Sequence, residues 1–202
     1  MGHIVLASKS PRRREILELL GIPHVVHGVD IDESSHLRRT VRSSVMNLSR
    51  AKAIEASSRY RRGLVLGVDT VVSFRGRVLG KPETEQQARV FLRMLRGNVH
   101  EVLSGITVLD AGCGAMRTSC SVSRVWFAPL DDTEIERYLE GEEWRDKAGG
   151  YAIQGQAALF VRRIEGSYYN IVGLPVEELH RLLKVFNFFN EPGKYEPLLR
   201  EG

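Results

Sequence analysis

Residues 3–21, HIVLASKSPRRREILELLG, join an apolar run, a short polar loop and a helix-like segment, and this order decides the predicted fold. The run HIVLA has the length and apolar content of a buried strand. In the segment that follows, Ser10 suits the N-cap, Pro11 the first helical position and Gly21 the residue after the helix end. A buried strand that passes directly into a helix is typical of α/β proteins.

Three arginines, Arg12, Arg13 and Arg14, stand at the start of this predicted helix. Positive charges there oppose the positive end of the helix macrodipole, which costs a few tenths to about 1 kcal/mol each unless an anion lies nearby. The backbone N–H groups of a helix start also bind phosphate readily. The segment therefore predicts a bound anion at this end of the helix.

The rest of the chain alternates strand and helix patterns, so we expect an α/β fold with a mixed central β-sheet flanked by helices. Strand patterns cover 23–31, a hairpin over 63–80, and two long antiparallel strands over 100–112 and 117–130. Helix patterns cover 41–60, 84–97 and 131–144, and 159–186 follows the order strand, turn, strand, helix. The length fits a single domain over 1–186, with a polar, flexible tail over 187–202.

The composition is that of an ordinary globular protein, with 43% hydrophobic and 27% charged residues. No apolar run approaches the ~20 residues of a membrane helix, and HIVLA is too short for a signal sequence, so we expect a cytoplasmic protein that has no membrane partner. Cys113 and Cys120 lack further ligands at zinc spacing, and we expect reduced cysteines that pack as small apolar side chains.

The formal net charge of +4 is unevenly distributed, because residues 1–63 contain twelve lysines and arginines: Lys9, Arg12, Arg13, Arg14, Arg38, Arg39, Arg42, Arg50, Lys52, Arg59, Arg61 and Arg62. A basic surface of this kind suits a polyanion, either a nucleotide or a nucleic acid. Charge alone favours the simpler interpretation, a solvated basic face.

Two charged residues lie at places where strands are expected to end. Asp69 follows the apolar run GLVLGV, where a strand would leave the core, and Lys81 stands in LGKP before a proline that forces extended backbone. Either could be an idle surface charge. A carboxylate flanked by apolar residues is nevertheless a costly choice for solubility, since its unpaired burial costs several kcal/mol, and this favours a functional Asp69.

Three further segments are each open to two interpretations. DIDE supplies Asp30, Asp32 and Glu33, which could bind a divalent cation or form an acidic turn. Lys52 lies on an amphipathic helix, where a lysine often only extends its stem over apolar neighbours. DKAGGYAIQG places charged residues and Gln154 beside glycines, which indicates either a close approach of backbone to ligand or an ordinary tight turn.

Eight motifs in this order resemble the Maf family of nucleoside triphosphate pyrophosphatases, also called septum-formation inhibitors. They are LASKSPRR, DIDES, LSRAKA, GVDTVV, LGKP, HEVLSGITV, DKAGGYAIQG and GSYYNIVGLPVEEL, and they cover residues 4 to about 185. The resemblance implies an inosine-triphosphatase-like architecture with two lobes and a cleft between them. It also implies hydrolysis of a nucleoside triphosphate to the monophosphate and pyrophosphate with a divalent cation, magnesium or alternatively manganese.

Within the family, DTVV together with YAIQG is similar to the subgroup that acts on dTTP and UTP. By that resemblance Asp69 is the proton acceptor, and the specificity positions are Arg12, Thr70 and Gln154. Phosphate is assigned to Ser8, Arg12, Arg13, Lys52 and Lys81, and the metal to Glu33 and Asp69. The chain departs from the family at Lys9, where a small residue is common, and at Leu103 and Ser104, where an aromatic residue and threonine are frequent.

The residue types agree with this chemistry, because attack of water at the α-phosphorus needs a base and charge neutralisation, and a glutamine amide can pair with the pyrimidine edge. The resemblance also implies a homodimer, and cleaning of nucleotide pools is the expected role. One alternative keeps the reaction and changes the substrate to 7-methyl-GTP or another modified nucleotide. Another is a nucleic-acid-binding regulator of division arrest, which the absence of interleaved aromatic residues disfavours.

Overall fold

The computed structural model describes residues 2–191 and 193–200, which divide into two compact units. Unit 1 takes its residues from 1–69, 104–121 and 173–202, and unit 2 consists of 70–103 and 122–172. Three strands contribute residues to both units: β4 (Leu64–Phe74), β6 (Val99–Asp110) and β7 (Met116–Phe127). The domain boundary at residue 186 and the cleft between two lobes stay predictions.

The sheet of unit 1 begins with the predicted N-terminal strand. β1 (Ile4–Ala7) is fully buried and pairs in parallel with β2 (His24–Val26) on one side and β4 on the other, and β6 and β7 follow. α1 (Pro11–Leu19) has Ser10 at its N-cap and Pro11 in its first turn, and Gly21 follows with a φ of +62°. The predicted succession of strand, loop and helix is confirmed.

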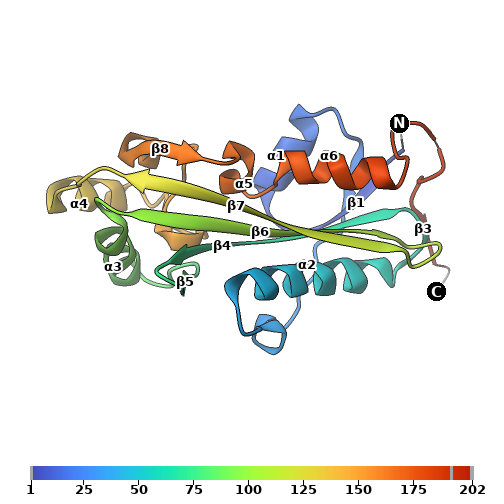
Figure 1. The fold of residues 1–202 in the computed structure, drawn as a ribbon, viewed down its shortest axis with the longest axis horizontal. Helices are drawn as coiled ribbons and strands as arrows, with labels where there is room; N and C mark the ends of the chain where they lie inside the picture. The colour runs from blue at the N-terminus through green and yellow to red at the C-terminus, as the bar shows by residue number, and fades with distance from the viewer. Residues whose placement is uncertain (1, 192, 201–202) are drawn as a thin grey trace. The chain divides into compact units, whose positions relative to one another are not determined.

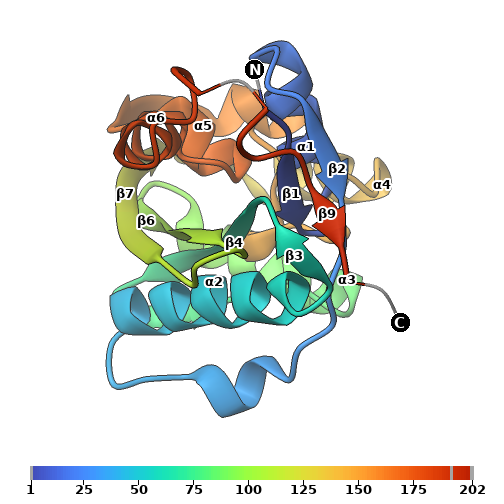
Figure 2. The ribbon, with the colours of Figure 1, turned by 90° about the vertical axis from the view of Figure 1, so that its right-hand side faces the viewer.

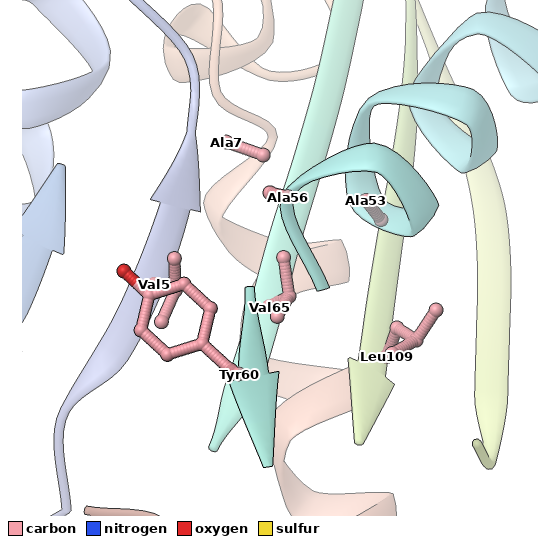
Figure 3. Close-up of a cluster of buried hydrophobic side chains, with 7 residues drawn as sticks. All are labelled: Val5, Ala7, Ala53, Ala56, Tyr60, Val65 and Leu109. Carbon is pink, nitrogen blue, oxygen red and sulfur yellow. The ribbon is translucent and has the colours of Figure 1, made fainter. Parts of the chain in front are cut away.

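Two helices cover opposite faces of this sheet, α2 (Val41–Ser57) on one and α6 (Val176–Val185) on the other (Figures 1 and 2). α2 starts with a capping box between Thr40 and Ser43. Its small side chains pack against the strands in a cluster of buried residues (Figure 3): Val5, Ala7, Ala53, Ala56, Tyr60, Val65 and Leu109. A short 3₁₀ helix, η1 (Glu33–His36), precedes α2.

The chain after α6 packs onto unit 1. Phe188 and Tyr195 are buried, and the Tyr195 hydroxyl donates a hydrogen bond to the Phe186 carbonyl at 2.8 Å. β9 (Leu198–Leu199) pairs antiparallel with β3 (Tyr60–Arg62). The described residues of 187–202 therefore add core and strand contacts to unit 1, while the flexibility expected of this segment stays a prediction.

Unit 2 contains the remaining parts of β4, β6 and β7, together with β5 (Arg77–Leu79) at one edge and β8 (Val161–Glu165) at the other. Arg75 and Gly76 form the predicted hairpin turn with φ values of +50° and +79°. α3 (Glu85–Leu95) forms within the helix pattern of 84–97 and buries one apolar face: Ala88, Phe91, Leu92 and Leu95. α4 (Asp132–Glu140) begins at the N-cap Asp131, as its acidic first turn predicts.

Residues 168–172 of the segment SYYNIVG form a helix, so the second strand expected within 159–186 is wrong. α5 (Tyr168–Val172) follows Gly166, whose φ is +101°, and ends before Gly173, whose φ is +127°. Ser167 Oγ accepts a hydrogen bond from the Asn170 backbone N–H, and the Asn170 side chain donates to the Val102 carbonyl. Periodicity cannot distinguish a buried strand from one turn of buried helix in so short an apolar run.

The observed fold is α/β with a mixed sheet flanked by helices, as predicted. Parallel pairing occurs at β1, and antiparallel pairing occurs between β4 and β5 and between β7 and β8. Within the part of the chain that the structure describes, no helix has the length and apolar character needed to cross a membrane.

Candidate active site

Asp69 is a buried carboxylate inside a strand of unit 1. β4 continues to Phe74, so the expectation that the strand leaves the core at Asp69 is wrong, and Asp69 is only 6% exposed. Its Oδ1 accepts a hydrogen bond from Lys52 Nζ at 2.7 Å. Among the described residues, Oδ2 has no hydrogen-bond partner. A buried acceptor without a partner is costly, which marks this oxygen as one that a ligand would satisfy.

The Lys52 ammonium bridges two carboxylates. Besides Asp69, its Nζ contacts Glu33 Oε1 at 3.0 Å, and the lysine side chain is only 14% exposed. Burial of the Asp69 carboxylate is tolerable because this ammonium compensates its charge. Lys52 therefore does more than extend its stem over apolar neighbours, and the structure brings together Lys52, Glu33 and Asp69 as a set.

Two glycines that the sequence analysis did not single out allow this arrangement. A Cβ added at Gly67 of β4 would collide with the backbone of α2 at Ser49 and Ala53, and one at Gly105 of β6 would collide with the α2 backbone at Val45. The helix therefore lies directly against the strands. From it, Lys52 reaches Asp69, which is two residues after Gly67 in β4. An isolated glycine within an apolar strand is the sequence signal for such a close approach.

A chain of hydroxyl groups also fastens α2 to the sheet. Ser49 Oγ and Thr107 Oγ1 are 2.9 Å apart, Thr107 Oγ1 and Thr118 Oγ1 are also 2.9 Å apart, and Arg50 Nε donates to Thr118 Oγ1 at 3.0 Å. These contacts link the helix to β6 and β7, and they hold the helix that carries Lys52.

The loop before α1 is organised by Arg13. Arg13 Nη1 donates to Ser8 Oγ at 2.8 Å, and Arg13 Nε donates to the Gly173 carbonyl at 2.9 Å. Ser8 is buried, and its hydroxyl also accepts from the Ser10 backbone N–H at 3.2 Å. Burial lowers the pKa of Arg13 to about 10, although the nearby charge of Asp69 opposes the shift. The guanidinium therefore stays positive at neutral pH.

The first turn of α1 contains no acidic side chain. Arg12 lies close enough to Arg13 for its positive charge to lower the Arg13 pKa further. The positive charge that prompted the expectation of an anion is thus concentrated at this helix start, where the backbone adds a positive potential.

The three acidic residues of DIDE, Asp30, Asp32 and Glu33, have different partners. Asp30 pairs with Lys9, and Asp32 caps η1 by accepting hydrogen bonds from Ser34 N at 3.0 Å and Ser34 Oγ at 2.6 Å. These hydrogen bonds from Ser34 lower the pKa of Asp32. Of these residues, Glu33 belongs to the set around Lys52. Asp32 forms the acidic turn that was one of the two interpretations of this segment.

The other predicted site residues belong to unit 2. Thr70 follows Asp69 in β4 and is partly buried. Lys81 is exposed after β5, and its loop is joined to the 146–150 segment by a hydrogen bond from Gly149 N to the Gly80 carbonyl at 2.9 Å. Gln154 is also exposed. The structure brings together the candidates of unit 1, whereas Thr70, Lys81 and Gln154 belong to unit 2.

Gly155, next to Gln154, has a packing reason within unit 2. A Cβ at this position would collide with the Glu143 carboxylate, which accepts a hydrogen bond from the Gln156 backbone N–H at 2.9 Å. The close approach that the glycine permits is therefore one of backbone to Glu143, and it fixes the loop that presents Gln154.

The carboxylates of unit 1 are of the donor type that a divalent cation binds. Within residues 2–191 and 193–200, no three or more His, Cys, Asp or Glu side chains are grouped to hold a metal ion. Mg²⁺ usually takes only one or two protein carboxylates, together with water and substrate phosphates. Glu33 and Asp69 converge on one ammonium, and the partnerless Asp69 Oδ2 is an oxygen donor of the required kind.

A buried carboxylate beside a lysine, near an arginine-bearing helix start in an α/β fold, is a constellation suited to phosphate compounds. The family model described as Maf-like protein matches residues 3–186, so the chain belongs to the Maf family.

Relatives match over nearly their full length. The dTTP/UTP pyrophosphatase of Halalkalibacterium halodurans is 43% identical over 188 residues, which is 93% of this chain and 98% of that protein. The dTTP/UTP pyrophosphatase of Pyrococcus abyssi is 43% identical, over 90% of this chain and 95% of that protein. A solved structure described as a HAM1 protein from Coxiella burnetii aligns with a TM-score of 0.49 at 16% identity, covering 92% of this chain and 100% of that one.

Proposed function

We propose that this protein hydrolyses dTTP and UTP to the monophosphate and pyrophosphate. Relatives at about 40% identity carry that name and align with more than 90% of the chain. The observation that carries the proposal is the buried Asp69 carboxylate, which has one oxygen bound to Lys52 and the other without a partner among the described residues.

Asp69 has the features of a proton acceptor for the attacking water. Lys52 fixes one carboxylate oxygen, so the orientation of the other is set before any ligand arrives. A pre-oriented carboxylate can accept a proton from the attacking water. It also directs the lone pair of the water oxygen towards the α-phosphorus. The P–O bond to the β-phosphate then breaks, and pyrophosphate leaves with the electron pair.

Several cations can neutralise the charge that develops on the phosphates. In unit 1 these are Lys52, Arg12 and Arg13, and Ser8 offers a hydroxyl at the same loop. Lys81 is proposed to contribute from unit 2. Mg²⁺, with Mn²⁺ as the alternative, would be held by Glu33 and Asp69, and such a cation supplies Lewis-acid stabilisation of phosphoryl oxygens.

Discrimination between the nucleobases of different substrates is assigned to neutral hydrogen-bonding groups together with Arg12. The exposed Gln154 amide has a donor and an acceptor, which match the O4 and N3–H of thymine or uracil. Thr70 directly follows Asp69, the proposed proton acceptor, in β4. The proposal also includes a cytoplasmic homodimer, pool cleaning as its role and a link to septum formation. The homodimer and the link to septum formation come from the family resemblance.

The test is a panel of nucleoside triphosphates at fixed Mg²⁺ with an assay for pyrophosphate. We expect dTTP and UTP to give equimolar monophosphate and pyrophosphate, with purine triphosphates and 7-methyl-GTP turned over more slowly. Release of orthophosphate alone, or turnover of none of these nucleotides, would contradict the proposal. Preference for 7-methyl-GTP would keep the reaction and overturn the substrate assignment.

A further inference from the structure

Lys9 lies in the loop of unit 1 that carries Ser8, and the proposed mechanism does not use it. Its ammonium donates hydrogen bonds to both carboxylate oxygens of Asp30, at 2.7 Å and 2.6 Å. Both side chains are exposed, at 64% for Lys9 and 86% for Asp30. An exposed ion pair contributes little to global stability, so any importance of this pair must be local.

Gly28 supplies a second, independent observation. Its φ lies outside the positive range that favours glycine, so the backbone does not require a glycine there. A Cβ at Gly28 would collide with Lys9 Cγ and would lie 3.4 Å from Cε and 3.5 Å from Cδ. The lysine stem thus occupies the space that a side chain at residue 28 would fill, and its ammonium reaches Asp30 beyond it.

The segment held in this way leads to Glu33. At its start, His27 N donates to the Leu6 carbonyl at 2.9 Å, and at its end Glu33 contacts Lys52 at 3.0 Å. The pair of Lys9 and Asp30 lies between these two contacts in sequence. It joins the loop that contains Ser8 to the segment that presents Glu33.

We propose that Lys9, Gly28 and Asp30 form a clasp that holds the Glu33 segment against the Ser8 loop, and that Lys9 is a positioning residue acting through Asp30. The assignment of Glu33 rests on the proposed function, whereas the clasp itself does not. A small residue at position 9 could not make these contacts, so the clasp follows from this chain's own lysine.

A direct contact between Lys9 and a substrate phosphate is the rival explanation, because the ammonium is adjacent to Ser8. The two explanations differ for Asp30. If Lys9 bound phosphate, removal of the Asp30 charge would release the ammonium and strengthen nucleotide binding. If Lys9 acts through Asp30, removal of either charge loosens the same segment.

Three variants of the 202-residue chain separate these explanations. Lys9→Met keeps the stem and removes the charge, Asp30→Asn removes the partner charge, and Gly28→Ala displaces the stem. Lys194→Met is the matched control, because Lys194 forms another exposed pair, with Glu191 at 2.7 Å. Hydrogen exchange is measured without nucleotide at the backbone amides of His27 and Ser34, whose hydrogen bonds flank Asp30.

We expect exchange at these two amides to rise by up to about fivefold in all three variants and to stay unchanged in the control. The double variant Lys9→Met/Asp30→Asn should exchange no faster than either single variant. Unchanged exchange in the three variants would overturn the clasp, whether or not the protein hydrolyses dTTP.

Kinetics give the second readout. We expect KM for dTTP to rise by a few fold in all three variants while kcat changes by less than twofold. A lower KM in Asp30→Asn together with a higher KM in Lys9→Met would overturn the clasp in favour of phosphate binding by Lys9. Because the exchange measurement needs no turnover, failure of the proposed function and failure of the clasp are distinguishable.

Discussion

Four candidate residues of unit 1 and two of unit 2 differ in how the protein holds them. In unit 1 each of Ser8, Arg13, Lys52 and Asp69 is buried or partly buried, and each takes part in a hydrogen bond to another residue of that unit. In unit 2, Lys81 and Gln154 are exposed side chains on loops.

This difference agrees with what the two sets are proposed to do. Stabilisation of developing charge is most effective when charged groups are fixed before the reaction, since no reorganisation is then required. Recognition of a base edge needs an accessible amide whose partners are supplied by the ligand. The predictions below test whether unit 1 governs turnover and unit 2 governs discrimination.

The largest expected effect is that of Asp69→Asn. The amide oxygen can still accept the hydrogen bond from Lys52, so the shape is kept while charge and basicity are lost. Turnover of dTTP should fall by at least ~10²-fold, as is typical for loss of a general base, while nucleotide binding survives. Steady-state kinetics and calorimetric titration with a non-hydrolysable analogue check both parts.

Asp110→Asn is a suitable control, because Asp110 ends β6 in the same unit and accepts a hydrogen bond from Gly112 N. Its turnover should stay within twofold of the parent protein. Near-normal turnover of Asp69→Asn would remove Asp69 as the base and with it the contrast between the units.

A second experiment concerns the buried histidine of unit 2. His100 is 2% exposed, and its Nε2 forms a hydrogen bond with the Tyr151 hydroxyl at 2.8 Å. Burial lowers the pKa of His100 to about 4 and raises the pKa of Tyr151. Unit 1 therefore buries a charge that is paired, whereas unit 2 buries an imidazole that stays neutral at pH 7.

The sign of the pH dependence follows from proton binding. An unfolded histidine binds a proton near pH 6.5, so between pH 6.5 and pH 4 the unfolded chain binds more protons than the folded one. Stability should fall as the pH falls through this window, with a loss from His100 of ~2 kcal/mol at pH 5. The loss of urea midpoint between pH 7 and pH 5 should be smaller in His100→Asn, and an equal loss in both proteins would exclude the linkage.

The sequence predicted those features that depend on local chemistry. The strand, cap and proline around α1 and the apolar face of α3 follow from residues adjacent in sequence or at helical spacing. The sequence indicates a functional Asp69 because burial of a carboxylate between apolar residues costs free energy. This argument does not depend on where the strand ends. The expectation that the strand leaves the core at Asp69 was wrong, since Asp69 is buried within β4, whereas the turn at Arg75 and Gly76 ends this strand as the hairpin pattern predicts.

Features that depend on packing between distant segments could not be predicted in the same way. The helix α5 forms in a segment too short for periodicity to decide. The roles of Gly67 and Gly105 appear only when α2 lies against the strands, and the Gly173 carbonyl meets Arg13 across 160 residues. A glycine within a strand signals that some other segment approaches closely, but a single sequence shows neither which helix approaches nor which group binds a backbone carbonyl.

Gln154→Ala should have a smaller effect than Asp69→Asn and one of a different kind. The change removes the proposed contacts to the pyrimidine edge and leaves the groups of unit 1 intact. We expect kcat/KM for dTTP and UTP to fall by about tenfold towards the purine values, with little change for purines. Gln156→Ala is the matched control, because Gln156 is also exposed and begins the short 3₁₀ helix that directly follows this loop. An equal loss for every nucleotide would place Gln154 with the phosphates or the fold instead.

The smallest effect is expected for Thr107→Val, which removes the central hydroxyl between α2 and β7. Ser49 Oγ would keep its hydrogen bond to the Met46 carbonyl, and Thr118 Oγ1 would keep the one from Arg50. Because both neighbours retain a partner, the loss of stability should be only ~1 kcal/mol, measured as a lower urea midpoint with unchanged slope.

Turnover decides what this hydroxyl chain does for the site. Lys52 stays bound by Asp69 and Glu33 in the Thr107→Val protein, so kcat for dTTP should change by less than twofold. Thr107→Ser, which keeps the hydroxyl, should retain the hydrogen bonds and show how much of the change in midpoint comes from the methyl group. A fall in kcat in the valine variant that serine restores would mean that the position of α2, and not the ion pairs alone, orients Asp69. The rigidity of unit 1 would then extend from the charged groups to the sheet that supports them.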